Sequence, residues 1–274
     1  MKIGAHVSAA GGVQNAPLNA HKLGCECYQF FSRSPQGGDA LKLSQEIIKK
    51  FKENNKKYNF KDFYIHAPYY INLASSKKNI YYGSIAVLRE ELERGSQLGA
   101  KYLMTHLGSA KDLGDQKAIQ QTTKGISEVL KNYIGSCGFL IETSAGSGQI
   151  IGNTFEEIAE ILLKLKNKIG ICYDTAHAFE SGYDIRDKKS VKNTLNEFDK
   201  IIDLDKLKLI HINDSKTDLG SRVDRHEHIG KGKIGLNGFN ALINNKKLQN
   251  INLILETPAD NLRINDIKIL KDLR

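Results

Sequence analysis

Histidine and carboxylate side chains are concentrated in one stretch, 206–232, with the sequence KLKLIHINDSKTDLGSRVDRHEHIGKG. A strand-like apolar run ends at His211, and a polar loop follows it. That loop carries four further groups that can bind a metal: Asp214, Asp224, His226 and His228. Imidazole nitrogens and carboxylate oxygens together suit zinc, manganese or iron. Because a short loop needs few such groups for packing, the stretch indicates a metal-binding loop at the end of a strand.

Eight apolar runs have the length and composition of β-strands. They are 2–7, 26–31, 62–66, 101–106, 138–142, 169–174, 207–212 and 251–256. Amphipathic stretches typical of helices follow them: 12–23, 44–57, 77–98, 115–134, 154–167, 187–203, 236–247 and 260–273. Thr154 and Gly99 carry the residue types of a helix start and a helix stop.

Eight alternations of strand and helix predict an α/β protein with a single domain, 1–274, folded as a (β/α)₈ TIM barrel. An open doubly wound sheet is the alternative. It would usually carry a glycine-rich phosphate turn after the first strand, and AHVSAAGG has the glycines without that spacing.

Six consecutive strand candidates end in a potential metal ligand. These residues are His66, His106, Glu142, Asp174, His211 and Glu256. Three more lie just beyond strand ends: His177, Asp224 and His226. The carboxyl ends of barrel strands converge on one mouth, so we expect these side chains to meet there. Nine ligands exceed the needs of one tetrahedral ion, and bridging carboxylates would let them hold two or three. Clustered metals suit phosphoester cleavage.

Charge and composition narrow the choice of partner and compartment. The net charge of +9 favours a polyanion such as nucleic acid, although a composition rich in Lys, Asn and Ile explains the charge equally well. No 18-residue apolar run or signal-peptide pattern is present, so we expect no membrane partner. The four cysteines lie mostly in apolar runs, which favours free thiols in a reducing, cytoplasmic compartment.

With these residues in place, the chain resembles the endonuclease IV family, the trinuclear-zinc abasic-site endonucleases. The motifs that carry the resemblance run from end to end. They are GAHVSAAGG (4–12), IHAPYYINLAS (65–75), MTHLGS (104–109), IETSAGSGQIIG (141–152), YDTAHAFESGYD (173–184), HINDSK (211–216), GSRVDRHEHIGKG (220–232) and LETP (255–258).

The resemblance implies three zinc ions, with manganese as an alternative at one site. The expected first site is His66, His106 and Glu142; the second is Glu142, Asp174, His211 and Glu256; the third is His177, Asp224 and His226. It also implies base excision repair of double-stranded DNA that contains abasic sites. Metal-activated water would hydrolyse the phosphodiester 5′ to the abasic deoxyribose, leaving a 3′-hydroxyl and a 5′-deoxyribose phosphate. Glu142 is the candidate for orienting or deprotonating that water.

DNA contacts follow less directly from the resemblance. Tyr69 matches a tyrosine that family members insert at the lesion, and Gln36 stands where members carry a wedge arginine. Expected phosphate contacts are Arg33, Lys216, Arg222 and Arg225, and each of these could equally be a solvated charge. We expect His6 to lie near the mouth and His228 to hydrogen-bond a ligand. The resemblance further implies a monomer in the cytoplasm, associated with the nucleoid if the source is bacterial.

A divalent-metal sugar isomerase or epimerase on the same barrel is the chief alternative. It would need one or two metals, which leaves His177, Asp224 and His226 without a purpose. A non-enzymatic DNA-binding or metal-storing barrel is the other alternative, but storage does not require ligands to converge strand by strand.

Overall fold

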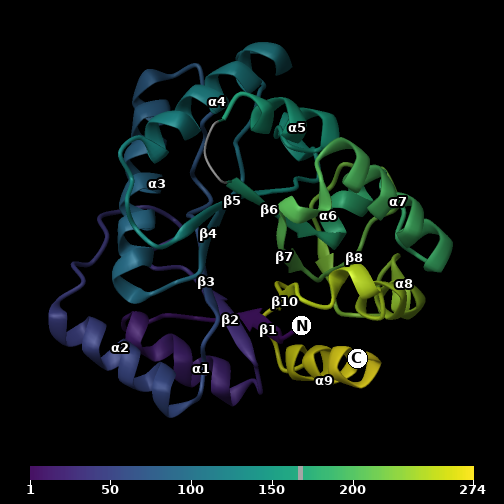
Figure 1. The fold of residues 1–274 in the computed structure, drawn as a ribbon, viewed down its shortest axis with the longest axis horizontal. Helices are drawn as coiled ribbons and strands as arrows, with labels where there is room; N and C mark the ends of the chain where they lie inside the picture. The colour runs from purple at the N-terminus through teal and green to yellow at the C-terminus, as the bar shows by residue number, and fades with distance from the viewer. Residues whose placement is uncertain (166–168) are drawn as a thin grey trace.

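The computed structural model describes residues 1–165 and 169–274. Eight parallel strands form a closed barrel, in which the last strand pairs with the first (Figure 1). In chain order they are β1 (Ile3–His6), β2 (Cys27–Phe30), β3 (Phe63–His66), β4 (Tyr102–Thr105), β5 (Gly138–Glu142), β6 (Ile169–Asp174), β7 (Leu207–His211) and β10 (Asn252–Leu255). The predicted α/β barrel is confirmed, and each of these strands lies within its expected range.

Helices surround the barrel (Figure 1). They are α1 (Ala16–Lys22), α2 (Gln45–Lys57), α3 (Lys78–Leu98), α4 (Asp115–Leu130), α5 (Phe155–Leu163), α6 (Thr175–Glu180), α7 (Lys188–Ile201), α8 (Gly235–Ile243) and α9 (Arg263–Leu273). Two local signals are confirmed. The Thr154 hydroxyl accepts a hydrogen bond from the backbone N–H of Glu157 and caps α5, and Gly99 ends α3 in the left-handed conformation, at φ 89°.

Several helix boundaries differ from those expected. The range 12–23 is divided into a 3₁₀ turn, Val13–Asn15, and α1. The range 154–167 is helical only to Leu163, and its last two residues lie outside the described part of the chain. Periodicity does not predict α6, because six residues complete fewer than two helical turns.

Two layers of side chains fill the barrel. The first is apolar and consists of Cys27, Tyr64, Met104, Leu140, Cys172, Leu209 and Ile254. Because side chains alternate between the two faces of a strand, the residue two positions further along also points inward. That second layer, at the carboxyl ends, consists of Gln29, His66, His106, Glu142, Asp174, His211 and Glu256. The alternation of side chains along the strands alone therefore places the potential metal ligands at one end of the barrel.

A short antiparallel hairpin follows β7 and was not anticipated by the strand pattern. It pairs β8 (Asp214–Ser215) with β9 (His226–Glu227), and the connecting segment 216–225 forms its loop. β8 lies against α6 at the mouth of the barrel. The hairpin therefore returns the chain to the mouth after β7. Within the described ranges, the helices are too short or too polar to cross a membrane.

Candidate metal centre

Glu142 lies at the centre of the second layer, at the end of β5. Its Oε2 lies 2.9 Å from His66 Nε2 and 3.5 Å from His106 Nε2, and its Oε1 lies 2.8 Å from His211 Nδ1. The carboxylate is fully buried. Burial alone would raise the pKa of Glu142, but the surrounding histidines outweigh burial and hold it well below its ordinary value. Glu142 is therefore ionised at neutral pH, and a histidine nitrogen lies close to each of its oxygens.

Three groups of side chains place nitrogen or oxygen atoms within 4.8 Å of one another. They are His66, His106 and Glu142; Glu142, Asp174, His211 and Glu256; and Asp174, His177 and His226. Asp224 adjoins the third group, with Oδ1 3.3 Å from His177 Nε2 and 3.7 Å from His226 Nε2. The structure thus brings all nine predicted ligands together. It also places Asp174, which we expected only in the second group, 3.7 Å from His226 Nε2.

Hydrogen bonds on the far side of the rings determine which nitrogen faces the centre. The Nδ1 atoms of His66, His177 and His226 lie 2.6, 3.0 and 3.2 Å from the backbone oxygens of Ala67, Thr143 and Glu256. A carbonyl oxygen only accepts, so each Nδ1 carries the proton and each Nε2 presents a lone pair. His177 Nε2 and His226 Nε2 lie only 3.2 Å apart. Two lone pairs this close repel each other unless a proton or a metal ion lies between them.

The donor sets fit divalent metal ions by distance and by chemistry. Around a tetrahedral ion with bonds of about 2.1 Å, donor atoms lie about 3.4 Å apart. The histidine–carboxylate pairs in this centre lie between 2.8 and 3.9 Å apart. Its donors are imidazoles and carboxylates, a set that suits zinc, manganese or iron. Bound cations would also neutralise carboxylates that are costly to bury together.

Gln29, at the inner face of β2, is a site residue that the sequence reasoning missed. Its Oε1 lies 2.8 Å from His211 Nε2, which therefore donates and leaves Nδ1 facing Glu142. Its Nε2 donates to Glu256 Oε1 at 2.6 Å. Glutamine is not a usual metal ligand, so a search for ligand types passes over it. Its place two residues after Cys27, in the register of the other ligands, is the signal that could have found it.

The remaining residues of the histidine-rich stretch have other partners. His228 Nδ1 lies 2.7 Å from Asp266 on α9, and Nε2 lies 3.2 Å from Asp260, so the expectation that His228 bonds a ligand is wrong. The buried Asp214 carboxylate accepts backbone N–H groups from the segment 230–235 and organises that turn. His6 lies near the mouth as expected, with Nδ1 3.5 Å from Glu256 Oε1.

A cavity of about 500 Å³ lies above the candidate ligands and is open to solvent. Tyr69 and Arg225 line it together with the ligands. The Tyr69 ring is 68% exposed and lies 6.0 Å from the His66 ring, between centroids. The other predicted DNA contacts on exposed loop positions are Gln36, Lys216 and Arg222.

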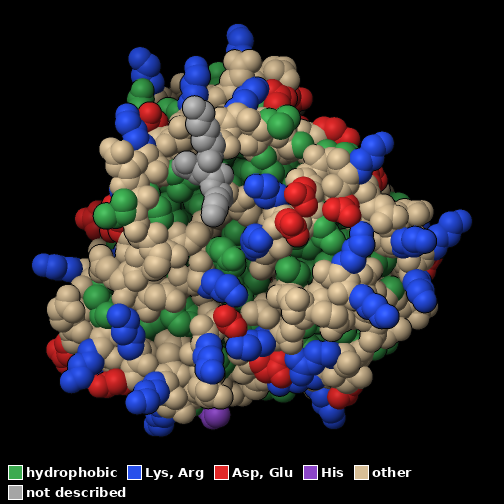
Figure 2. Space-filling view, in the orientation of Figure 1, with side chains coloured by type: hydrophobic (Ala, Val, Ile, Leu, Met, Phe, Trp, Pro, Cys, Tyr) green, Lys and Arg blue, Asp and Glu red, His purple; other side chains and the backbone are tan. Residues whose placement is uncertain are grey.

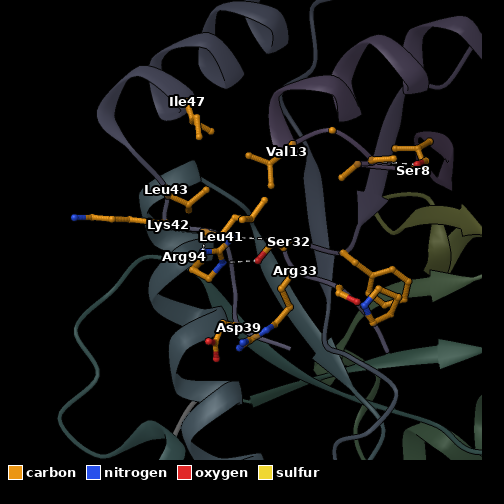
Figure 3. Close-up of a pocket in the computed structure, with 18 of the residues that line it drawn as sticks. Ser8, Val13, Ser32, Arg33, Asp39, Leu41, Lys42, Leu43, Ile47 and Arg94 are labelled. Atoms are coloured by element: carbon orange, nitrogen blue, oxygen red, sulfur yellow. Dashed lines mark hydrogen bonds between the residues drawn. The ribbon is translucent and has the colours of Figure 1, made fainter. Parts of the chain in front are cut away.

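Arg33 departs from its expected role as a phosphate contact. Its side chain is only 5% exposed, because the guanidinium donates to Glu90 Oε2 at 3.0 Å and to the backbone oxygen of Gly38 at 3.2 Å. It lines a second, largely apolar cavity of about 560 Å³ between the loops that follow β1 and β2 (Figure 3). The buried Arg94 also lines this cavity. In this structure Arg33 holds its own loop in place.

Basic side chains are spread over the surface that Figure 2 shows. Lys and Arg residues lie all around that face, with acidic residues among them, and do not gather in one patch. Net charge alone therefore does not locate a nucleic-acid surface on this face, and the site must be argued from the metal centre.

Comparisons with known proteins agree with this geometry. Residues 18–273 match a family model described as a xylose isomerase-like TIM barrel. A probable endonuclease 4 from Nitrosopumilus maritimus is 40% identical over 267 residues, 96% of this chain and 95% of that protein. Endonuclease IV from Thermus thermophilus matches with a TM-score of 0.88 and 28% identity, covering 100% of this chain and 98% of that chain. A D-tagatose 3-epimerase-like protein has a TM-score of 0.77 at 18% identity, covering 100% and 97%, a likeness of fold alone.

Proposed function

The chain belongs to the endonuclease IV family of xylose isomerase-like TIM barrels, and we propose that it is a zinc-dependent abasic-site endonuclease. Membership makes it a DNA-cleaving hydrolase of a metal-dependent family. The finer proposal is that it hydrolyses the phosphodiester 5′ to an abasic site. The products would be a 3′-hydroxyl and a 5′-deoxyribose phosphate, and the reaction would serve base excision repair.

The observation that carries this proposal is the third group of candidate ligands. One or two metals suffice for a sugar isomerase, and the first two groups would hold them. His177, His226 and Asp224 would then hold no metal. If they hold a third cation, the centre favours phosphoester chemistry, in which clustered metals stabilise both the attacking and the leaving oxygen.

The chain's own side chains would hold and orient the reaction. Glu142 belongs to the first two groups and is our candidate for bridging two ions and for orienting or deprotonating the attacking water. Zinc, when bound, lowers the pKa of water toward ~7 and neutralises phosphate charge. Gln29 fixes the ring of His211, and backbone carbonyls fix the rings of His66, His177 and His226, so these donors are oriented before substrate arrives.

Recognition of the abasic site would fall to the exposed loops around the mouth. Tyr69 stands beside the His66 ring with most of its surface free, which suits insertion into the gap that a missing base leaves in a duplex. Gln36 is the residue proposed to lie at the lesion in place of a wedge arginine, and Lys216, Arg222 and Arg225 are the proposed contacts with the DNA backbone. We further propose that the protein acts as a monomer, in the cytoplasm where it reaches chromosomal DNA.

The test is cleavage of a duplex that carries one tetrahydrofuran abasic analogue, followed by analysis of both new ends. We expect a 3′-hydroxyl and a 5′-phosphorylated abasic residue, loss of activity with a chelator, and three zinc ions per chain by elemental analysis. An intact duplex, together with epimerisation of a ketohexose, would overturn the proposal. A parallel reaction uses a natural abasic site, because the tetrahydrofuran analogue lacks the C1′ aldehyde that β-elimination requires. A β-elimination product from that natural site would exclude the hydrolytic chemistry.

A further inference from the structure

Helix α6 links the barrel to the third group of candidate ligands. Asp174 caps its first turn, because Asp174 Oδ1 accepts the backbone N–H of His177 at 2.9 Å. His177 lies inside the helix, and Glu180 is its last residue, almost one turn further along. This short helix thus carries one candidate ligand, is capped by a second, and ends in a buried carboxylate whose role is not yet explained.

The Glu180 carboxylate is a centre around which the hairpin loop folds. Its Oε1 accepts the hydroxyl of Ser215 at 2.7 Å, the hydroxyl of Thr217 at 3.3 Å and the backbone N–H of Arg225 at 3.3 Å. The backbone oxygen of Glu180 accepts the N–H of Arg222 at 2.9 Å. These four donors come from both ends and the middle of the segment 215–225.

That segment ends in the ligands of the third group. Asp224 precedes Arg225, and His226 follows it. The bond from the Arg225 N–H to Glu180 therefore lies between the two ligands along the chain. Since His177 stands on the same helix as Glu180, the carboxylate sets the distance between the helix that carries one ligand and the loop that carries the other two.

Burying the Glu180 carboxylate costs free energy. It is fully buried, and no Lys or Arg in the described ranges forms an ion pair with it. Its second oxygen, Oε2, has no hydrogen-bond partner. Burial raises the pKa of Glu180 to about 7. A hydrophobic residue would fill the same space at lower cost, so the hydrogen bonds are the reason that the geometry gives for a carboxylate here.

We propose that Glu180 is a positioning residue that assembles the third metal site by fixing Asp224 and His226 opposite His177. This inference rests on the proposed function, because it assumes that a cation occupies the third group. It does not assume any particular substrate.

The test compares metal binding by Glu180→Ala and Glu180→Gln. Alanine removes the acceptor and frees the loop, so we expect one zinc to bind about 10–100-fold more weakly, as for other residues that orient metal ligands. Glutamine should bind zinc like the wild type. Its Oε1 can still accept the three donors, and its amide nitrogen would take the place of Oε2, which has no partner to lose.

Glu91→Ala is the matched control. Glu91 is also fully buried and also accepts a serine hydroxyl, that of Ser32 at 2.7 Å, but it lies on α3, away from the third group. Zinc content is measured after dialysis against a weak chelator, and the cobalt-loaded protein is followed by its visible spectrum. Hydrogen exchange of the 216–225 amides reports on the loop itself. We expect faster exchange in Glu180→Ala and no change in Glu91→Ala.

The outcomes separate this inference from the proposed function. If Glu180→Ala binds all of its zinc as tightly as the wild type, the inference is overturned. A loss of the same size in Glu91→Ala would also overturn it, because the effect would then be general. If Glu180→Ala does not fold, Ser215→Ala removes the shortest of the three bonds and should weaken the same zinc to a smaller extent. If Glu180→Ala selectively loses zinc but the wild-type protein leaves abasic DNA intact, the proposed function is refuted and the inference stands.

Discussion

Replacing Arg94 by alanine should release the loop between β2 and α2 from the helix that supports it. Arg94 lies on α3, and its guanidinium reaches both ends of this loop. It donates to the backbone oxygen and the hydroxyl of Ser32 at 2.5 and 2.8 Å, and to the backbone oxygen of Leu41 at 2.8 Å (Figure 3). Gln36, the residue expected at the lesion, lies on the stretch between these two anchors.

The expected loss of stability in Arg94→Ala follows from the burial of the ion pair between Arg94 and Glu91. Arg94 is 6% exposed and Glu91 is fully buried, with their nearest charged atoms 3.5 Å apart. Removing one partner of a buried ion pair costs roughly 3–5 kcal/mol, because the other charge stays buried without compensation. We therefore expect Arg94→Ala to lower the free energy of unfolding by about 3–5 kcal/mol.

Urea unfolding measures this loss, and a double-mutant cycle tests its origin. In Glu91→Ala/Arg94→Ala the uncompensated charge is gone, so the double variant should lose less than the sum of the single losses, by roughly 1–3 kcal/mol. In conditions where Arg94→Ala stays folded, the KM for an abasic duplex should rise more than kcat falls, because the metal centre is untouched. A stability loss below about 1 kcal/mol, or strictly additive single losses, would refute the reasoning.

Three further predictions concern the centre, the lesion contact and the barrel's amino end. Glu142→Gln should nearly abolish cleavage while the circular dichroism spectrum is kept; near-normal turnover would contradict its bridging role. Tyr69→Ala should weaken binding of an abasic duplex more than it slows single-turnover cleavage at saturation, and unchanged affinity would make Tyr69 an ordinary loop residue. The hydrogen bonds from Arg274 lower the pKa of Glu26 below its ordinary 4.5, so this pair stabilises the fold above that pH. At pH 7 we expect Arg274→Ala to be less stable than the wild type by roughly 0.2–1 kcal/mol. This difference should vanish as the pH falls through the folded pKa of Glu26, because protonation removes the ion pair. A difference that persists at pH 3 would exclude the pair as its cause.

The barrel and the first two ligand groups are predictable from the sequence for one physical reason. Strands alternate their side chains with a period of two, and barrel strands end at a common mouth. A residue such as Glu142, two positions after the buried Leu140, must therefore point into the mouth once the strand is recognised. The same rule applied to Cys27 would have found Gln29, but only if amides had been considered together with metal ligands.

The parts that were not predictable depend on contacts between loops. Nothing in the local sequence indicates that Arg33 turns inward to Glu90, since an arginine on a polar loop is usually solvated. From the local sequence, His228 is one more possible ligand of the site. Its actual partner, Asp266, comes close only because α9 packs there. Helix α6 is too short to produce a periodic signal, so the place of Glu180 opposite the hairpin could not be seen either.

The hairpin loop is attached to the barrel in a way that bears on how such folds diversify. Its residues are held by a polar anchor, the carboxylate of Glu180, which accepts two hydroxyl groups and a backbone N–H group. Few side chains of the loop enter the apolar core, so its sequence and length can change without repacking of the strands beneath. Replacing this one segment would remove Asp224 from the third group of candidate ligands and leave the barrel unchanged. The loop is thus a replaceable module on a stable scaffold.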